Sequence, residues 1–574
     1  MEISEIFSLI GGLCLFLFGM HIMGEALERK AGGKLRTVLG RLTSNKAAGF
    51  LTGMVVTAII QSSSATTVMT VGFVNSGLMS LRQAIMVIMG ANIGTTMTAW
   101  ILSLVGLEQG NIFTLLLKPS SFSPILALIG VVLYVFLKND KKKETGLILL
   151  GFSTLMFGME TMSDAVSGLK DIPGFADLFL LFSNPLLGAL VGMILTVIIQ
   201  SSSASTGILQ ALAATGQVTF ASAIPIIIGQ NVGTCATSLI SCVGATRDAK
   251  RTALVHLSFN LIGATVWLIV YCIVKSIFQP VLLSQATTAA GIAVVHTLFN
   301  VGCTILMLPM TGLLEKLVVK LVPGKDEDHS ASELDERLFA SPSIALQRSH
   351  DVTADMALDV SMCVKETLAS MEDADKAESV CKSTKHAEKR KEELDKYLIQ
   401  LSSMSLDTAS HKEVAMLLKV SAELSYISRQ NLEIAECVYK LHQEELSSAA
   451  REEIMLMSRA VNELLKLSMS ALMGSDPKAA ATVPALTQVI HGLKRDIHER
   501  HVGRLQNHIC SAAAGVVWLD ILTALERISD HFANICSHVL EGSDVAEAPE
   551  TYSDEKMKDV YRTFEEKFSL SAVQ

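Results

Sequence analysis

Gln61-Ser62-Ser63-Ser64 occurs twice in this chain of 574 residues, and its second copy is Gln200-Ser201-Ser202-Ser203. The copy extends well beyond four letters, because residues 53–101 align with 192–240 without a gap and 21 of the 49 positions are identical. A long internal duplication in an apolar chain is typical of a transporter built from two structural repeats. We therefore expect two related membrane repeats.

The charge distribution divides the chain into two parts. Residues 1–322 hold 19 Lys/Arg and 13 Asp/Glu, whereas residues 323–574 hold 28 and 43. This asymmetry predicts a membrane part followed by a soluble, acidic part. The net charge of −9 arises in the second part, and no nucleic-acid partner is expected.

Two further features bear on processing and redox chemistry. The first five residues lack the basic region of a cleavable signal peptide, so we expect the apolar run 6–23 to remain as a membrane helix. The ten cysteines include no Cys-x-x-Cys pair. This usage suits reduced thiols rather than a disulfide or zinc framework.

Apolar runs of about 20 residues predict seven membrane crossings. They lie near 6–23, 83–105, 121–138, 145–162, 220–243, 252–275 and 286–310. The two Gln-Ser-Ser-Ser stretches differ, because each lies between apolar arms that are too short to cross. These arms, 47–60 with 65–77 and 186–199 with 204–216, predict re-entrant hairpins with a polar tip near mid-membrane.

The Lys/Arg pattern predicts the topology. Basic residues cluster at 28–46, 138–143 and 247–251, and the positive-inside rule places all three segments in the cytoplasm. The N-terminus is then outside and the C-terminus cytoplasmic. Because the first repeat contributes an odd number of crossings, the second repeat must be inverted. The hairpins would then enter from opposite faces and their tips would meet.

The soluble part has the apolar spacing of long amphipathic helices. They are expected at 350–373, 386–404, 408–442, 450–473, 479–502 and 509–541, in two three-helix bundles. The predicted fold is all-α, with membrane domain 1–322 (repeats about 6–138 and 145–310), linker 323–340, helical domain 341–545 and polar tail 546–574. The tail contains one expected short helix at 553–568.

The hairpin tips carry hydroxyls and amides but no charge. A helix N-terminus presents unpaired N–H groups and a positive dipole end, which suit an anion. Unwound carbonyls and hydroxyls suit a hard monovalent cation such as Na⁺. The alternative is that these serines hold helices together in the membrane; two matching copies favour a binding site.

A second duplicated element is Gly90-Ala91-Asn92-Ile93-Gly94-Thr95, which matches Gly229 to Thr234. Two glycines with Asn between them weaken a helix and permit an unwound segment, where Asn and Thr could coordinate an ion. Small-residue helix packing is the alternative interpretation.

Two other polar patterns lie in the apolar segments. His256 and His296 each precede an Asn by four residues, and a hydrogen-bonded role in tying helices together is favoured over proton relay. A serine hydrolase is disfavoured, because the serines are not in a Gly-x-Ser-x-Gly turn.

Together, the paired tips, the paired Gly-x-Asn elements and the His-x-x-Phe-Asn helices resemble the type II sodium/phosphate cotransporter family over about residues 6–318. In that family the two Gln-Ser-Ser-Ser stretches form the phosphate and sodium site between inverted repeats. The resemblance implies phosphate as substrate, Na⁺ as coupling ion and no tightly bound cofactor. The implied site residues are Gln61, Ser62, Ser63, Ser64, Thr66, Asn92, Thr95, Gln200, Ser201, Ser202, Ser203, Thr206, Asn231 and Thr234.

Residues 340–541 resemble the PhoU-type helical domain, whose acidic Glu-x-x-x-Asp-x-x-x-Asn motifs bind metal. The second bundle keeps this motif at Glu526, Asp530 and Asn534, whereas the first bundle has Ser425, Arg429 and Glu433 in its place. The resemblance implies a divalent metal on the second bundle and a cytoplasmic regulatory partner.

The expected function is therefore sodium-coupled phosphate transport in a bacterial inner membrane, by a carrier rather than an enzyme. A membrane-anchored phosphate sensor is the alternative.

Overall fold

The structure is a computed structural model that describes residues 3–40, 45–106, 119–168, 181–324, 333–371, 377–441, 447–474, 476–507, 509–542 and 554–570. The chain forms two compact units, residues 1–345 and 346–574. Within the described ranges both are helical, and the β pairing there is a single bridge between Thr219 and Ala286. The all-α fold expected from the sequence is confirmed.

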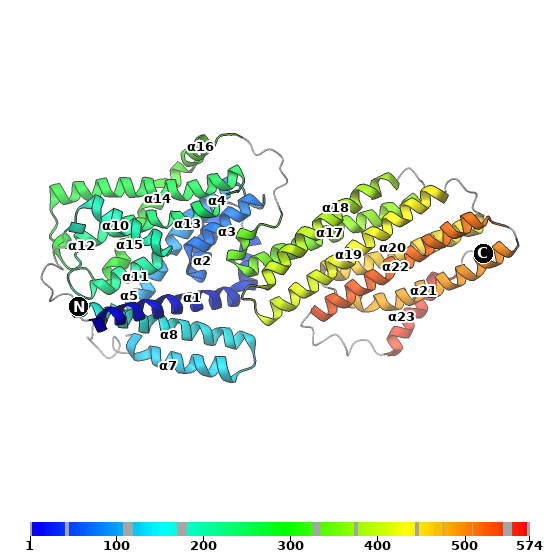
Figure 1. Cartoon of the computed structure of the whole chain (residues 1–574), viewed down its shortest axis with the longest axis horizontal. Helices are drawn as coiled ribbons and strands as arrows, with labels where there is room; N and C mark the ends of the chain where they lie inside the picture. Colours follow the sequence, from blue (N-terminus) through cyan, green and yellow to red (C-terminus); the bar gives the residue numbers. More distant parts are fainter. Residues whose placement is uncertain are drawn as a thin grey trace. The chain divides into compact units, whose positions relative to one another are not determined.

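The first unit repeats one order of helices (Figure 1). Its first copy comprises α1 (Ile3–Gly40), α2 (Lys46–Ile60), α3 (Ser63–Asn75), α4 (Leu81–Gly94), α5 (Thr96–Ser103) and α7 (Pro119–Val131). The second copy comprises α8 (Asp140–Ser167), α10 (Pro185–Ile199), α11 (Ser202–Ala213), α12 (Phe220–Gly233), α13 (Cys235–Ser241) and α14 (Arg247–Ile273). Helices α15 (Ala289–Met307) and α16 (Thr311–Leu321) follow.

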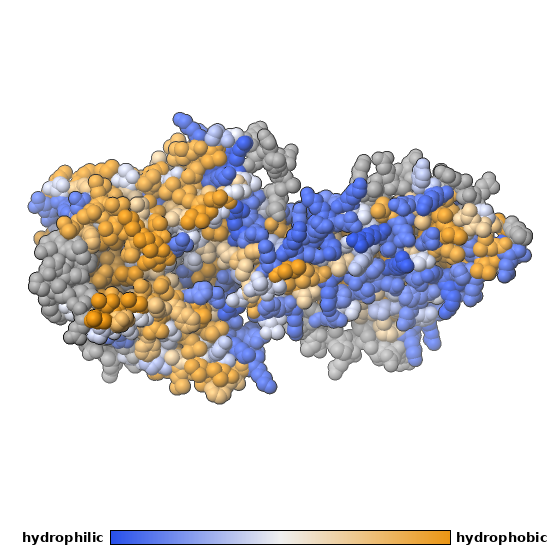
Figure 2. Space-filling view, in the orientation of Figure 1, coloured by the Kyte–Doolittle hydropathy of each residue, from blue (hydrophilic) through white to orange (hydrophobic). Residues whose placement is uncertain are grey.

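Six helical segments of the described chain are long and apolar enough to cross a membrane: 3–31, 81–106, 140–167, 220–241, 247–278 and 289–321. They confirm six of the seven expected crossings. The seventh, near 121–138, falls in a shorter apolar helix, 121–136, that packs on α8. Figure 2 shows a mostly hydrophobic visible face on the first unit and a mostly hydrophilic one on the second. The chain is a multi-pass membrane protein.

The second repeat is inverted relative to the first, and the packing of α1 on α8 shows it. A Cβ on Gly12 would lie 3.0 Å from the carbonyl oxygen of Gly158, and one on Gly19 would lie 2.6 Å from that of Gly151. Rising numbers in α1 meet falling numbers in α8, so the two helices are antiparallel. Because α1 and α8 are equivalent in the duplication, this antiparallel packing requires repeats of opposite orientation.

Glycines let each hairpin arm pack closely on the interrupted helix of its own repeat. A Cβ on Gly90 would lie 1.9 Å from the Phe50 carbonyl oxygen, and one on Gly229 would lie 1.9 Å from that of Ala189. The helices are interrupted at one residue each, Thr95 and Thr234, which keep right-handed φ, ψ values. The expected unwinding is therefore limited to one residue, and these glycines serve close helix packing.

The second unit contains the six expected helices, α17 (Pro342–Ser370), α18 (Ala377–Ser402), α19 (Thr408–Leu441), α20 (Ser448–Gly474), α21 (Pro477–Gln506) and α22 (Ala512–Gly542). One apolar core joins them; it includes Met356, Leu424, Leu464 and the fully buried Trp518. The expected short helix in the tail is α23 (Asp554–Lys567). It does not project freely, because Phe568 and Leu570 after it are buried in the same core.

Candidate functional site

The two hairpin tips have the same backbone conformation. Helix α2 ends at Ile60, and Gln61 follows with a left-handed φ of 60° while its N–H donates to the Thr57 carbonyl at 2.8 Å. In the second repeat Gln200 has φ 58° and donates to the Thr196 carbonyl at 2.7 Å. Left-handed conformations cost energy in residues other than glycine and persist where surrounding structure enforces them, often at functional sites. Each hairpin thus reverses over two residues.

The first serine of each motif is a helix cap. The Ser62 hydroxyl accepts a hydrogen bond from the Ala65 N–H at 3.1 Å, and the Ser201 hydroxyl accepts one from Ala204 at 3.2 Å. The next two serines of each motif form the first turn of α3 and α11. A first turn leaves backbone N–H groups without intrahelical acceptors. Each tip therefore presents N–H donors and hydroxyls at a helix N-terminus, where an anion is favoured.

Charged side chains are absent from the sequence around both tips. Residues 47–81 and 178–246, which hold the hairpins and α12 with α13, contain no Asp, Glu, Lys or Arg. An anion bound at these tips would have no fixed cation from these segments beside it. Hydroxyl and carbonyl oxygens, in contrast, are suitable ligands for Na⁺, whose charge would then favour the anion.

Each hairpin packs against the other repeat. Helix α3 lies against α13 and α14, and α11 lies against α5 and α15. The Ser64 hydroxyl is 3.3 Å from that of Thr237, and the Gln210 amide donates to the Ala99 carbonyl at 3.0 Å. The helix that begins at each tip therefore packs on the opposite repeat, α3 on α13 and α11 on α5. Both tips lie at the interface between the repeats.

The interruptions lie near the tip of their own repeat. A Cβ on Gly94 would lie 2.8 Å from the Thr57 side chain, and one on Gly233 would lie 2.8 Å from that of Thr196. Thr57 and Thr196 each stand one turn before a tip. The predicted residues Asn92, Thr95, Asn231 and Thr234 are all buried, and the structure thus places the two duplicated elements of each repeat together.

The amides of the Gly-x-Asn elements are oriented by their own helices. The Asn92 side chain donates to the Ile88 carbonyl at 3.1 Å, and that of Asn231 donates to Ile227 at 2.8 Å. This fixes the nitrogen and leaves the amide oxygen as an acceptor. In the second repeat that oxygen accepts a hydrogen bond from Asn300 at 3.2 Å.

Sequence reasoning missed several polar residues around the tips. In repeat one, Thr57 donates to Thr66 at 3.0 Å, and Thr98 donates to the Gln61 side chain at 2.9 Å. In repeat two, Gln230 connects Thr206 and Ser205, at 3.2 and 3.0 Å. A signal existed for some of them, because Thr57 and Thr98 are each identical to their partners at the 139-residue shift, Thr196 and Thr237.

Of the two buried histidines, His256 makes a side-chain contact between helices, whereas the His296 Nδ1 is buried without a hydrogen-bond partner among the described residues. The His256 ring lies 3.2 Å from the Ser238 hydroxyl, which links α14 to α13. Asn300, one turn after His296, donates to the His296 carbonyl and to Asn231. The His256 contact agrees with the helix-tying role favoured from the sequence, whereas in the His296 element Asn300 makes the contact between helices and the role of the His296 ring stays a prediction.

The predicted metal motif of the second unit has other partners. Glu526 is paired with Lys494, and Asp530 lies 2.7 Å from His491; both partners are on α21. Asn534 instead donates to Glu423 of α19 at 3.3 Å. Among the described residues no group of three or more His, Cys, Asp or Glu is arranged to hold a metal ion. The motif side chains are thus engaged with neighbouring helices in this structure, and metal binding stays a prediction.

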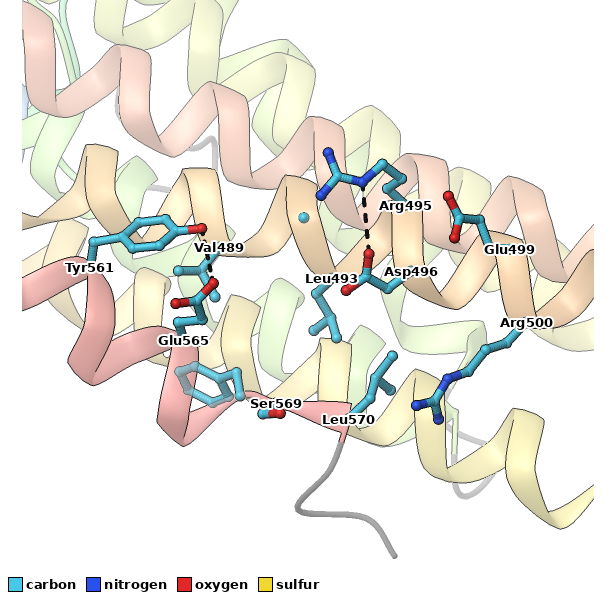
Figure 3. A pocket seen from close by; sticks show the side chains of 12 residues that line it. Val489, Leu493, Arg495, Asp496, Glu499, Arg500, Tyr561, Glu565, Ser569 and Leu570 are labelled. Atoms are coloured by element: carbon cyan, nitrogen blue, oxygen red, sulfur yellow. Dashed lines mark hydrogen bonds and ion pairs between the residues drawn. The ribbon is translucent and has the colours of Figure 1, made fainter. Parts of the chain in front are cut away.

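A pocket of about 600 Å³ lies between α21 and the C-terminal helix α23, away from the predicted residues (Figure 3). Arg495 and Arg500 line it together with Asp496, Glu499 and Glu565. Because charges of both signs face the pocket, it favours neither an anion nor a cation.

Comparisons with known protein families match both units. Residues 15–164 and 177–310 match the Na⁺/Pi-cotransporter family, and residues 454–539 match the PhoU domain. The PhoU match covers α21 and most of α20 and α22. A PhoU regulatory protein structure from Streptococcus pneumoniae is also similar, at 15% identity and a TM-score of 0.32, over 35% of this chain and 96% of that chain.

Individual relatives include one of similar length. The putative inorganic phosphate export protein YjbB of Escherichia coli is 26% identical over 568 residues, covering 95% of this chain and 99% of the relative. The uncharacterized protein YqeW of Bacillus subtilis is 30% identical over 314 residues, 54% of this chain and 97% of that protein. Rat sodium-dependent phosphate transport protein 2A is 40% identical over 94 residues, 15% of each chain.

Proposed function

Because this chain belongs to the Na⁺/Pi-cotransporter family, we propose that it carries inorganic phosphate across the membrane together with Na⁺, through one site formed by both hairpin tips. One observation carries the proposal. Two capped helix N-termini with matching backbones, each packed on the other repeat, lie within segments that hold no charged side chain.

The physical argument assigns roles to the tip residues. The N–H groups of α3 and α11 and the serine hydroxyls donate to phosphate oxygens. Backbone and hydroxyl oxygens at the tips, with the Asn92 and Asn231 amides, accept toward Na⁺. Because no Lys or Arg lies in these segments, bound Na⁺ supplies the positive charge beside the anion. This dependence of one ligand on the other couples phosphate movement to sodium.

The Lys/Arg pattern supports an orientation with the N-terminus outside and the second unit in the cytoplasm. Two hydrogen bonds agree with it, because each joins segments expected on one side. Asn75 accepts from the Thr246 N–H at 2.8 Å, at the inner side, and Lys275 donates to the Ser183 carbonyl at 2.7 Å, at the outer side. We place the protein in a bacterial inner membrane.

The direction of net transport depends on the gradients. A coupled carrier runs toward the lower combined electrochemical potential of its ligands, so one site serves uptake or release. The name of the YjbB relative refers to phosphate export. We propose that the PhoU-like unit regulates this flux and binds a cytoplasmic regulatory protein.

The test is flux of labelled phosphate in proteoliposomes that contain the purified full chain. An inward Na⁺ gradient is expected to drive accumulation, and an equal K⁺ gradient is not. Reversing the Na⁺ gradient should drive release from preloaded vesicles. If phosphate binds but no gradient produces flux, the sensor alternative is correct and the carrier proposal fails.

A further inference from the structure

The second half of the connection between the two units is packed on the first unit. Residues 333–341, here called the docked segment, belong to the first unit and contain a short 3₁₀ helix, η7 (Glu336–Ala340), that packs on α3. Leu338 and Ser341 are fully buried, and Asp335 is 4% exposed. A charged residue is rarely so buried unless it is paired, which indicates a specific contact.

Two side chains attach this segment to both repeats. Asp335 pairs with Arg337 at 3.0 Å and accepts a hydrogen bond from the Asn75 amide at the end of α3. Arg337 donates to the carbonyl oxygens of Ser241 and Val243, at 2.6 and 3.1 Å, at the end of α13. The docked segment therefore connects the last residue of α3 with the last turn of α13.

These two helices are the ones that meet at the candidate site. Helix α3 begins with Ser63 and Ser64 at the first tip, and α13 begins directly after Thr234. Near their site ends, Ser64 contacts Thr237. Opening a path between α3 and α13 from the site to the cytoplasm would require separating the ends that the docked segment joins.

The segment also fits α3 sterically. A Cβ on Gly72 would lie 3.1 Å from the Cβ of Arg337 and 3.1 Å from Leu338 Cδ2. Glycine at this position thus allows the docked segment to lie directly on the helix. After Ser341 the chain continues at once into α17, the first helix of the PhoU-like unit.

We propose that the docked segment is a cytoplasmic gate that holds α3 to α13, and that transport requires its release by the PhoU-like unit. This inference rests on the transport function and orientation proposed above. The gate gives the regulatory unit a direct covalent means of control, because displacement of α17 would pull on Ser341 and the residues before it.

A reversible covalent lock tests the gate. The double variant Gly72→Cys/Leu338→Cys leaves Asp335 and Arg337 in place, so a cross-link keeps the segment fastened to both α3 and α13. A Cβ on Gly72 would lie 3.6 Å from the Leu338 Cγ, where a cysteine sulfur would stand, which is close to the separation that a disulfide needs. In the reduced state this variant lacks the buried Leu338 side chain and should transport phosphate at least as fast as the wild-type chain. After oxidation, with the cross-linked peptide verified by mass spectrometry, sodium-driven uptake should fall by about tenfold or more and recover with reductant.

The single variants Gly72→Cys and Leu338→Cys, oxidised in parallel, control for the native cysteines. Unchanged uptake in the fully cross-linked double variant would overturn the gate. Failure to form the cross-link would overturn the docked arrangement itself.

A second measurement does not depend on transport. Cys242 lies between the two carbonyls that Arg337 binds and is half-buried. Burial raises the pKa of its thiol, and the nearby Lys250 and Arg337 act in the opposite direction. Asp335→Asn weakens the ion pair that holds the segment, so maleimide labelling of Cys242 from the cytoplasmic side should become about tenfold faster.

Arg82→Ala is the matched control, because it removes an exposed ion pair with Glu315 elsewhere in the same unit. Equal labelling of Cys242 in both variants and the wild-type chain would contradict the gate. If no variant transports phosphate while labelling responds as expected, the transport function fails and the docked segment stands.

Discussion

Gln61 and Gln200 end equivalent helices with nearly the same backbone, φ 60° and 58°, yet their side chains have different surroundings. Gln61 is 8% exposed and accepts a hydrogen bond from Thr98, whereas Gln200 is exposed. Local sequence sets the backbone of a tip, because both tips share their motif and their serine cap. The degree of enclosure depends on what the rest of the unit places around the tip.

The helices before the tips show the same difference. In α2 six residues are buried, and a Cβ on Gly24 of α1 would lie 3.4 Å from the carbonyl oxygen of Ile60. In α10 three residues are buried. Among the described residues, the docked segment packs on α3, the return helix of the first tip. The difference thus concerns the glutamine and the helix before each tip, because Ser63, Ser202 and Ser203 are all buried. The variants below test that comparison.

The largest expected effect concerns the packing that both repeats share. Gly90→Ala and Gly229→Ala each place a methyl group 1.9 Å from a carbonyl oxygen of the neighbouring hairpin arm. Overpacking of this kind costs about 1–3 kcal/mol or more, so both variants should lose most monodisperse protein in detergent. Gly312→Ala, with no atom within 4 Å, is the control. Wild-type thermal stability in one of the pair would show that the repeats pack differently there.

The second effect concerns the buried serines at the tips. Ser63→Ala and Ser202→Ala each remove one hydroxyl from the proposed shared site, and an unpaired buried partner costs about 1–3 kcal/mol. Apparent affinity for phosphate or Na⁺ should fall roughly ten- to hundredfold in both variants, with insertion unchanged. Ser103→Ala removes a buried membrane serine away from the tips and should leave affinity unchanged. Lower expression with normal affinity in the tip variants would instead indicate a helix-packing role.

The third effect should differ between the repeats. Gln61→Ala leaves the buried Thr98 hydroxyl without its acceptor, which costs about 1–3 kcal/mol in the absence of ligand. Gln200→Ala changes an exposed side chain and should alter stability by about 0.5 kcal/mol or less. Thermal unfolding without phosphate measures both. Equal losses would mean that the tips have equivalent surroundings in solution.

The smallest effect is a coupling across the repeat interface. Ser64 contacts Thr237, so a double-mutant cycle with Ser64→Ala and Thr237→Val should give about 0.5–1 kcal/mol in ligand-free protein. The equivalent pair is Ser203 with Thr98, and Thr98 is bonded to Gln61 instead. The cycle for Ser203 and Thr98 should give a coupling free energy near zero. A larger coupling for this pair than for Ser64 and Thr237 would mean that the second tip, not the first, makes the contact across the interface.

The sequence alone was sufficient for the duplication, the hairpins, the inversion and the helical second unit. These follow from repetition, segment length and charge placement, which are properties of the chain itself. The sequence did not decide the role of Gly90 and Gly229, because a glycine both weakens a helix and permits two helices to pack closely. The structure favours close packing, since a Cβ on either glycine would lie 1.9 Å from a carbonyl oxygen of the neighbouring helix.

Long-range contacts explain the remaining differences. Asp335 and Arg337 are polar residues in a short segment, and such residues usually indicate a solvated linker. Asp335 is buried beside Asn75, which is 260 residues before it in the chain. Arg337 is half-buried and binds the carbonyls of Ser241 and Val243, and no local pattern records these partners. The acidic motif at Glu526 and Asp530 shows the same limit, because Lys494 and His491 come from another helix.

The glycine contacts between α1 and α8 bear on how such a chain could arise. Gly12 packs against Gly158, and Gly19 packs against Gly151. In the duplication Gly12 is equivalent to Gly151 and Gly19 to Gly158. The two contacts are therefore equivalent to each other. This is the isologous geometry of a symmetric homodimer, in which one surface patch meets its own copy. A half-length ancestor that inserted into the membrane in both orientations could have formed the same contact between two separate molecules. Fusion of two such genes would then have fixed the opposed orientations in one polypeptide and allowed the two halves to diverge.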